Sequence, residues 1–179
     1  MTGGSGKGAG WVLDTERLSL RRLAEDDAEF IHGLLNEPSF LQYIGDRGVR
    51  TPEDARAYIR NGPVTSYAAN GFGLWLVSRR EDGAPTGMCG LLKRETLDDV
   101  DIGFAFRPAF WRKGYAVEAG AAVLAHGRAT FGLRRIVAIT QPDNLGSIRT
   151  LQRLGLTFER MVPAPGEGIE LQLFGITFP

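Results

Sequence analysis

A strand followed by a basic turn and a helix constrains this chain more than any other stretch. Residues 104–120 read FAFRPAFWRKGYAVEAG: apolar, strand-like residues run up to Phe106, Pro108 interrupts them, and an alanine-rich helix begins near Tyr115. The first backbone N–H groups of a helix have no partner within the helix, and the macrodipole adds partial positive charge at the same place. This order of elements therefore predicts an anion site between the strand and the helix.

The turn itself has the composition that such a site needs. Gly114 allows the backbone to approach a ligand closely, and Arg112 and Lys113 supply positive charge. The site would suit a pyrophosphate group. The alternative interpretation is an exposed basic loop that precedes a core helix.

A second strand and helix follow the first pair. After the apolar strand at residues 134–140 comes QPDNLGSIRTLQRLGLTFE, in which Asn144 and Ser147 lie at the start of a helix that ends at Gly155. Leucine and isoleucine recur on one face of this helix, which is typical of a helix packed on a core.

Taken in order, the strand, WRKGYA, helix, strand, NxxS and helix ending in LGLTFE resemble the GNAT acetyltransferases. The nearest likeness is to the ribosomal-protein N-terminal (alanine/serine) acetyltransferase branch, whose usual start is similar to DTERLSLRRLAEDDAEF here. The resemblance covers the chain from about Asp14 to its C-terminus. The superfamily turn commonly opens with Gln or Arg where this chain has Trp111, and Trp is what this branch often carries.

Length and periodicity predict one α/β (α+β) domain. A chain of 179 residues that is 43% apolar can bury one full core. We expect residues 1–13 to form a flexible glycine-rich arm or a remnant of cloning, and residues 14–179 to form a GNAT domain. Its central sheet is predicted to be mixed and mostly antiparallel, with about seven strands flanked by about four helices.

The individual elements follow from local patterns. Strands are predicted at residues 16–23, 73–78, 86–93, 101–106, 134–140, 157–162 and 168–177. The first helix is predicted at residues 25–36 and ends at Pro38, a second begins after the cap Thr51, and residues 40–50 form a loop beside the acceptor site in the family.

The resemblance implies that acetyl-CoA is the co-substrate. The turn would hold the pyrophosphate, the strand before it would bond the pantetheine arm and polarise the thioester carbonyl through its backbone, and the second helix start would approach the arm and its sulfur. The implied cofactor-binding residues are Phe104, Ala105, Phe106, Trp111, Arg112, Lys113, Gly114, Tyr115, Ala116, Asn144 and Ser147.

Three side chains are candidates for catalysis. Ser147 resembles the serine that faces the cofactor sulfur in this branch and could protonate the departing thiolate, or it could only cap its helix. Glu159 matches a glutamate of the same branch and is the first candidate for the general base. Asp101 is its rival, because other branches place an acidic residue at the start of this strand. Either carboxylate could instead be an exposed sheet residue.

These inferences predict an acetyl-CoA-dependent N-acetyltransferase that acts on a protein or peptide N-terminus by direct attack in a ternary complex. A small-molecule amine acetyltransferase and a non-catalytic CoA-binding module are the alternatives.

Lys plus Arg equals Asp plus Glu at 21 each, so nothing favours nucleic acid or an anionic membrane as a partner. We expect no metal, a buried and inert Cys89, a cytoplasmic location because no signal peptide is recognisable, and a monomer or a homodimer.

Overall fold

The computed structural model describes residues 7–164 and 168–179. One sheet of eight strands runs through the molecule in the order β1-β2-β3-β4-β5-β6-β8-β7. Each neighbouring pair is antiparallel except β5 and β6, which run parallel. The predicted mixed, mostly antiparallel α/β sheet is therefore confirmed, with one strand more than expected.

The strands are β1 (Trp11–Asp14), β2 (Leu18–Arg22), β3 (Leu74–Arg79), β4 (Pro85–Leu92), β5 (Asp101–Phe106), β6 (Arg135–Thr140), β7 (Thr157–Pro163) and β8 (Glu170–Thr177). The α-helices are α1 (Ala28–Leu35), α2 (Pro38–Tyr43), α3 (Pro52–Ile59), α4 (Thr65–Asn70), α5 (Tyr115–Phe131) and α6 (Leu145–Arg153).

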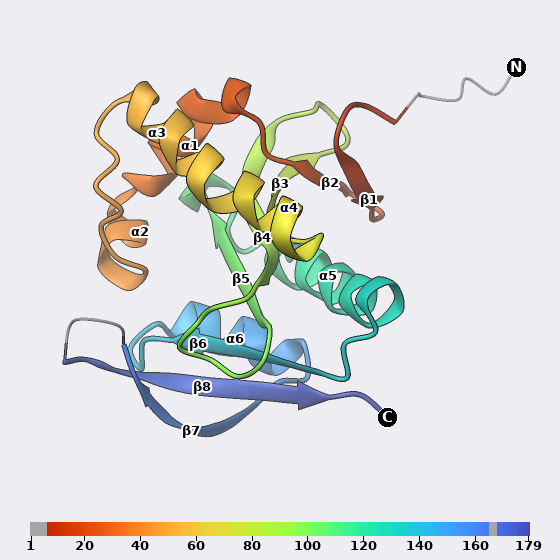
Figure 1. The fold of residues 1–179 in the computed structure, drawn as a ribbon, viewed down its shortest axis with the longest axis vertical. Coiled ribbons are helices and arrows are strands. Elements are labelled where there is room, and N and C mark those ends of the chain that lie inside the picture. The colour runs from red at the N-terminus through yellow and green to blue at the C-terminus, as the bar shows by residue number, and fades with distance from the viewer. Residues whose placement is uncertain (1–6, 165–167) are drawn as a thin grey trace, which may run out of the picture.

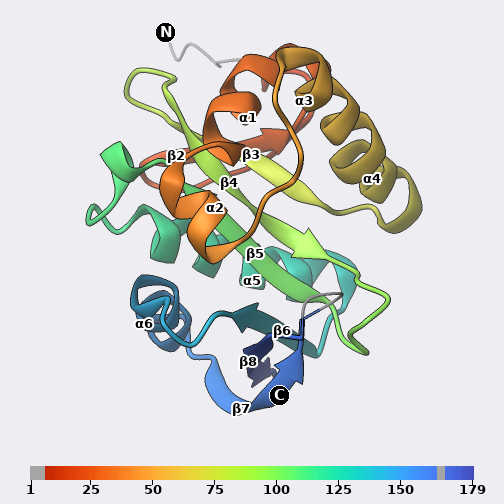
Figure 2. The same ribbon diagram turned by 90° about the vertical axis from the view of Figure 1, so that its left-hand side faces the viewer.

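Helices cover both faces of the sheet. Helices α1 to α4 lie over one face, and α5 and α6 lie over the other (Figures 1 and 2). Leu76 and Met88 point to the first face and pack against α1 and α3, whereas Leu91 and Ile102 point to the second and pack against α5. The alternation of side chains along each strand thus divides the core into two layers.

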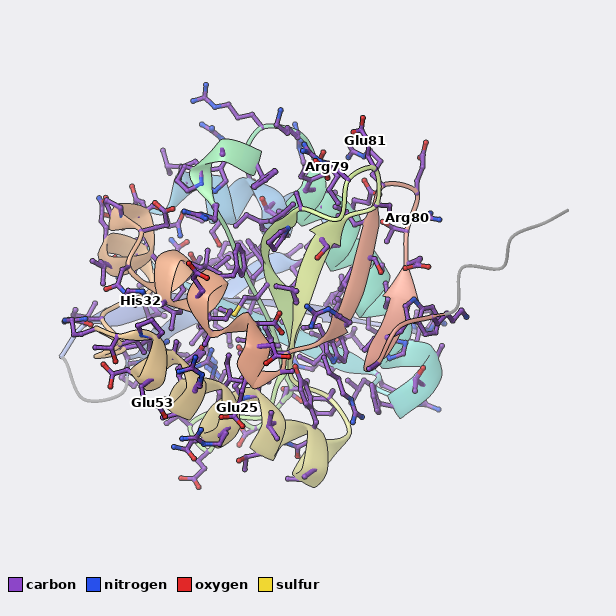
Figure 3. The ribbon with its side chains drawn as sticks, turned by 90° about the horizontal axis from the view of Figure 1, so that it is seen from above. Glu25, His32, Glu53, Arg79, Arg80 and Glu81 are labelled. Atoms are coloured by element: carbon purple, nitrogen blue, oxygen red, sulfur yellow. The ribbon has the colours of Figure 1, made fainter. Side chains whose placement is uncertain are left out.

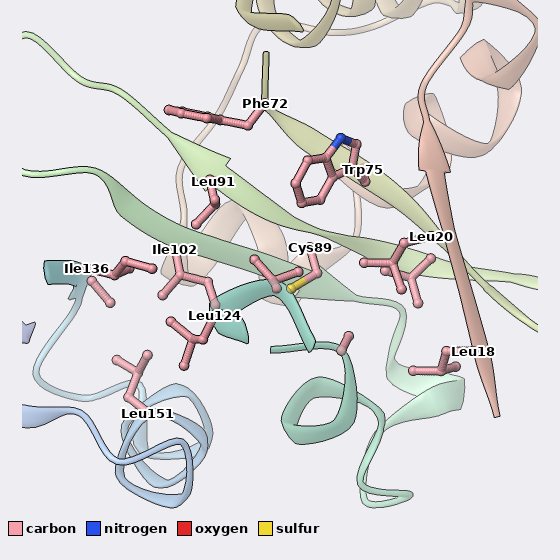
Figure 4. Packing of buried hydrophobic residues seen from close by; sticks show 14 of the residues in the cluster. Leu18, Leu20, Phe72, Trp75, Cys89, Leu91, Ile102, Leu124, Ile136 and Leu151 are labelled. Carbon is pink, nitrogen blue, oxygen red and sulfur yellow. The ribbon is translucent and has the colours of Figure 1, made fainter. Parts of the chain in front are cut away.

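Cys89 belongs to the layer under α5, where Leu18, Leu20 and Leu124 lie around it (Figure 4). Its side chain is fully buried, and burial raises the pKa of the thiol to about 12. The prediction that Cys89 is buried is confirmed, and a thiol that stays protonated is a poor nucleophile.

Strands β5 and β6 separate soon after they meet. Their register consists of one pair, Asp101 with Val137, and the Val137 N–H donates to the Val100 carbonyl at 3.0 Å. Beyond this pair β6 turns away together with β8 and β7 (Figure 1). The chain leaves both strands at their carboxyl ends and enters α5 and α6, so two helix N-termini lie at the edge where the sheet opens.

Two sequence predictions about the N-terminal part were wrong. Residues Trp11–Asp14 belong to β1 and not to an arm, because Val12 and Leu13 pack against the core while the backbone pairs with β2. The loop predicted at residues 40–50 is wrong at its start, because residues 40–43 belong to α2, which begins at Pro38; proline is tolerated at the first helical position, where no N–H is needed. The predicted end of the first helix before Pro38 is confirmed, since α1 ends at Leu35. The first six residues of the predicted arm lie outside the described residues.

A helix that the sequence did not predict follows α3. A π-helical turn, Arg60–Val64, joins α3 to α4, and Pro63 lies inside it. Proline has no N–H to donate in a helix interior, and the wider turn accommodates this. The cap predicted at the other end of α3 is confirmed, because the Thr51 hydroxyl accepts a hydrogen bond from the Asp54 N–H at 3.1 Å.

Candidate active site

Strand β6 pairs with β5 only at Asp101 and Val137, so within the described residues the rest of β5 has no strand partner on the side that faces β6; this unpaired stretch between the two strands is called the gap. The Arg107 N–H donates to the Thr86 carbonyl of β4 at 2.9 Å. Successive residues of a strand direct their backbone groups to opposite sides, so the groups of Phe104 and Phe106 face β6. Since β6 has already turned away, the N–H groups of these two residues can bond a chain that enters the gap.

The turn after β5 is braced by its tryptophan. Trp111 Nε1 donates to the Phe106 carbonyl at 2.8 Å, so the indole joins the turn to the end of the strand while 47% of the side chain stays exposed. Arg112 has φ of 59° and Gly114 has φ of 79°, both in the left-handed region. A left-handed arginine is uncommon, and such strained backbone is found at ligand sites.

The N-terminus of α5 has no side-chain cap. Gly114 occupies the cap position without a side chain, and the first helical bond is that from the Glu118 N–H to the Gly114 carbonyl at 3.0 Å. Within residues 7–164 and 168–179 the N–H groups of residues 115–117 form no hydrogen bond and can bind a ligand, in contrast to the first turn of α3, which Thr51 caps. A helix of 17 residues with an open N-terminus favours an anion at this place.

The start of α6 forms the other rim of the gap. Asn144 is its cap, and the Asn144 Oδ1 accepts from the Ser147 N–H at 3.2 Å. Ser147 is half-buried in the first turn. Because Asn144 supplies the cap, the Ser147 hydroxyl is not needed for it, and the alternative that Ser147 is only a cap loses its support.

Asp101 lies where β5 and β6 diverge. Its side chain is 1% exposed, and Arg94 Nε donates to both carboxylate oxygens at 3.1 Å. Burial raises the pKa of Asp101, and the attraction of Arg94 only partly opposes this shift. A carboxylate with a raised pKa at the apex of the gap has the properties of a general base.

Glu159 is a predicted site residue that lies away from the gap in the described part of the chain. It lies at a bulge of β7, where its carboxylate forms two hydrogen bonds with Arg135, at 2.8 and 2.6 Å. The carboxylate covers Gly175 of β8, and Gly175 pairs with Val137 of β6, so two strand spacings, about 10 Å, separate it from Asp101. Hydrogen bonds from Arg135 also lower the pKa of Glu159, which makes it a weaker base.

Two side chains near the turn were missed by the sequence analysis. Arg17, just before β2, and Glu118, in the first turn of α5, form an ion pair with an N–O distance of 2.7 Å beside Gly114. They are 101 residues apart in the sequence. An acidic residue in a first helical turn was the one available signal, and it says nothing about its partner.

Other kinds of site find no support in residues 7–164 and 168–179. Within these ranges no three metal-binding side chains lie together. In the same part of the chain, no helix combines the length and the apolarity needed to cross a membrane.

A helix N-terminus that follows the carboxyl end of a strand is a place where proteins bind phosphate groups. A family model described as an acetyltransferase (GNAT) domain matches residues 17–157. The chain belongs to the GNAT acetyltransferase family and is an acetyltransferase.

Individual relatives are similar over most of the chain. The uncharacterized N-acetyltransferase YnaD of Bacillus subtilis (strain 168) is 29% identical over 159 residues, which is 87% of this chain and 90% of the relative. The FsC-acetyl coenzyme A-N(2)-transacetylase of Aspergillus fumigatus is 25% identical over 172 residues, 89% of this chain and 72% of that protein.

Solved structures share the fold. The structure of RimL, a ribosomal alpha-N-protein acetyltransferase in complex with coenzyme A, superposes with a TM-score of 0.80 and covers 94% of this chain and 98% of its own. At 18% identity this similarity supports the fold and no more.

Proposed function

We propose that this protein transfers the acetyl group of acetyl-CoA to the α-amine of a protein or peptide N-terminus. The observation that carries the proposal is the gap between β5 and β6, which opens directly beside the uncapped N-terminus of α5. A cofactor with a pyrophosphate and a long amide-containing arm matches both features.

In this proposal the pyrophosphate binds the N–H groups of the turn from Trp111 to Ala116. The pantetheine arm would lie in the gap and bond the backbone N–H groups of Phe104 and Phe106, with Asn144 on the opposite rim. An N–H of β5 polarises the thioester carbonyl and stabilises the oxyanion that forms on attack. Removal of one such donor costs about 3 kcal/mol of barrier in other enzymes.

The chemical step is a direct attack in a ternary complex. The amine nitrogen forms a bond to the thioester carbonyl carbon, the C–S bond breaks, and the amide and the free thiol of CoA are released. Asp101 accepts the amine proton, through a water molecule because the carboxylate is buried, and the Ser147 hydroxyl donates a proton to the departing thiolate and recovers one from solvent.

The free-energy cost of deprotonating the acceptor amine at pH 7 favours an α-amine as acceptor. At pH 7 an α-amine with a pKa near 7.8 is neutral in about one molecule in ten, whereas a lysine with a pKa near 10.4 is neutral in about one in 2,500. The corresponding free energies of deprotonation are about 1 and about 4.6 kcal/mol. One carboxylate that works through water easily offsets the first cost, whereas the second lies near the upper end of the about 10² to 10⁴ that a general base contributes.

The acceptor would approach from the face of the sheet that carries α1 to α3. Asp101 shares this face with Met88 and Ala105, and a hollow of about 420 Å³ lies between residues 47–49 and α3. Arg47, Tyr58 and Asn61 line this hollow. The loop that was expected beside the acceptor therefore has space next to it.

A small-molecule amine is the second candidate acceptor. It is favoured by the similarity to the transacetylase of Aspergillus fumigatus, whose name places its activity at an N(2) position. Turnover of acetyl-CoA, followed by release of free thiol across a panel of peptides and small amines, distinguishes the two. Peptides with a free N-terminus should be acetylated at least tenfold faster than their N-blocked forms, which retain lysine amines.

Saturating acetyl-CoA should raise the melting temperature. A ligand at about one hundred times its dissociation constant adds about 2.7 kcal/mol to the free energy of unfolding, which corresponds to about 5 to 10 °C for a domain of this size. A thermal scan with and without acetyl-CoA measures the shift, and adenosine at the same concentration is the control. An unchanged melting temperature would contradict cofactor binding.

Replacing Ser147 by alanine should lower turnover about tenfold and leave acetyl-CoA affinity within a few-fold, because a thiolate is a good leaving group and needs only weak help. The helix should persist, since Asn144 provides its cap. Thr150→Ala removes a hydroxyl one turn further along α6, where it bonds the Gly146 carbonyl, and is the matched control. Equal turnover in the two variants would remove Ser147 from the mechanism.

A further inference from the structure

An ion pair between two distant parts of the chain holds the turn before α5. Glu118 Oε1 accepts hydrogen bonds from the Thr15 hydroxyl at 2.7 Å and from the Arg17 N–H at 2.8 Å, and Oε2 accepts from Arg17 Nε at 2.7 Å. The Arg17 guanidinium also lies 4.7 Å from the centre of the Tyr115 ring. Burial alone would raise the pKa of Glu118, but these hydrogen bonds outweigh it and the pKa is lowered, so the carboxylate is charged at neutral pH.

The same guanidinium reaches the backbone of the turn. Arg17 Nη1 donates to the Lys113 carbonyl at 2.8 Å. The C=O and N–H groups of one trans peptide point in opposite directions, so a fixed Lys113 carbonyl also fixes the direction of the Gly114 N–H. That N–H points away from Arg17 and is one of the open donors at the start of α5. The bond also keeps a carbonyl dipole turned away from the donors.

Charge balance gives Arg17 a second effect. Glu118 is one turn inside α5, close to the place where an anion would bind, and an uncompensated carboxylate there would repel a phosphate. Arg17 neutralises this charge with an N–O distance of 2.7 Å. Both effects act on the anion site and neither touches the region of Asp101.

We propose that Arg17 is a positioning residue for cofactor binding: through Glu118 and the Lys113 carbonyl it sets the turn in the conformation that receives the pyrophosphate. This rests on the proposed function, in which the turn binds acetyl-CoA. Because about half of the Arg17 side chain is exposed, its ion pair adds little to overall stability, and the expected effect is on affinity.

Arg17→Gln should weaken coenzyme A binding about fivefold by calorimetry, the size of effect expected when a charge-assisted hydrogen bond is lost. Arg80→Gln is the matched control. Arg80 lies in the hairpin between β3 and β4 (Figure 3), and its guanidinium also bonds backbone carbonyls, those of Thr15 and Glu16, but no hydrogen bond or ion pair joins its side chain to the turn in the described residues. It should bind coenzyme A as the unmodified protein does.

The variant Arg17→Lys separates the effect of hydrogen-bond geometry from the effect of charge. Arg17→Lys keeps the positive charge, but one ammonium group cannot reproduce the separate bonds to Glu118 and to the Lys113 carbonyl. It should still bind coenzyme A about threefold more weakly than the unmodified protein. Arg17→Lys also keeps the ion pair with Glu118, so it can test the role of Arg17 in binding if Arg17→Gln does not fold.

A substrate without the pyrophosphate tests where Arg17 acts. S-acetylpantetheine lacks the part of the cofactor that the turn would hold, so kcat/KM with this donor should be equal in Arg17→Gln and the unmodified protein, while kcat/KM with acetyl-CoA falls. A structural defect would lower both.

Three results would overturn the role of Arg17: unchanged coenzyme A affinity in Arg17→Gln, an equal loss in Arg80→Gln, or full affinity in Arg17→Lys. In each of these the unmodified protein still binds coenzyme A. If the unmodified protein does not bind coenzyme A at all, the proposed function itself fails.

Discussion

Replacing Asp101 by asparagine is expected to lower turnover about a hundredfold and to leave acetyl-CoA affinity within a few-fold. A general base contributes about 10² to 10⁴ in rate, and it does so in the transition state, so binding of the cofactor in the ground state should persist. Asparagine has nearly the same shape and keeps an oxygen for Arg94, which is itself one-third exposed and can be solvated. Thiol release at saturating substrates and calorimetry with acetyl-CoA measure the two quantities.

The pH dependence gives an independent test of the same residue. A base must be deprotonated to act, so activity is lost as pH falls through its pKa. Burial raises the pKa of Asp101 above the ordinary 3.8, which moves this loss toward neutral pH. On the acidic side, the slope of log kcat/KM against pH should be lower by one in Asp101→Asn, because one titrating group has been removed.

Two further variants complete this experiment. Asp99→Asn alters a carboxylate in the bend two residues before Asp101, one that pairs with Arg135 at 2.9 Å, and should retain turnover. Glu159→Gln should also retain turnover, because that carboxylate is bound to Arg135 away from the gap. Loss of activity in Glu159→Gln but not in Asp101→Asn would return the role of base to Glu159. Full activity in both would mean that the enzyme works by positioning alone.

Local patterns predicted the parts of the fold that depend on neighbours in sequence. The bounds of β5, the start of α5 at Tyr115 and the cap at Thr51 were all predicted, because strand alternation, a glycine at a helix start and a capping box act within a few residues. The start of α5 at an uncapped Gly114 belongs to this group, whereas cofactor binding by the turn stays a prediction.

Pairings between distant segments could not be predicted in the same way. Strand β8 lies between β6 and β7, and only this order puts Glu159 above Gly175 and beside Arg135. The sequence motif GLTFE contains no information about that partner. Likewise, Arg17 and Glu118 meet because β2 and α5 pack together, and no local pattern joins them.

Replacing Gly114 by valine is expected to weaken acetyl-CoA binding at least tenfold. Gly114 has φ of 79°, a conformation that a β-branched residue adopts only under strain, and a Cβ there would come within 3.3 Å of Arg17 Nη2. Either the turn changes conformation and its donors are misdirected, or the new side chain occupies the approach of the pyrophosphate. Both results remove N–H groups from the anion. Calorimetry with acetyl-CoA measures the loss.

Gly132→Val is the matched control for this variant. Gly132 ends the same helix in the same left-handed conformation, with φ of 65°, and a Cβ added there would meet no described atom within 4 Å. The substitution therefore has a similar backbone cost at the opposite end of α5. If both variants melt at similar temperatures and only Gly114→Val loses affinity, the loss comes from the turn. Equal affinity in the two folded variants would place the pyrophosphate elsewhere, and the N-terminus of α5 would then be an ordinary solvated helix start.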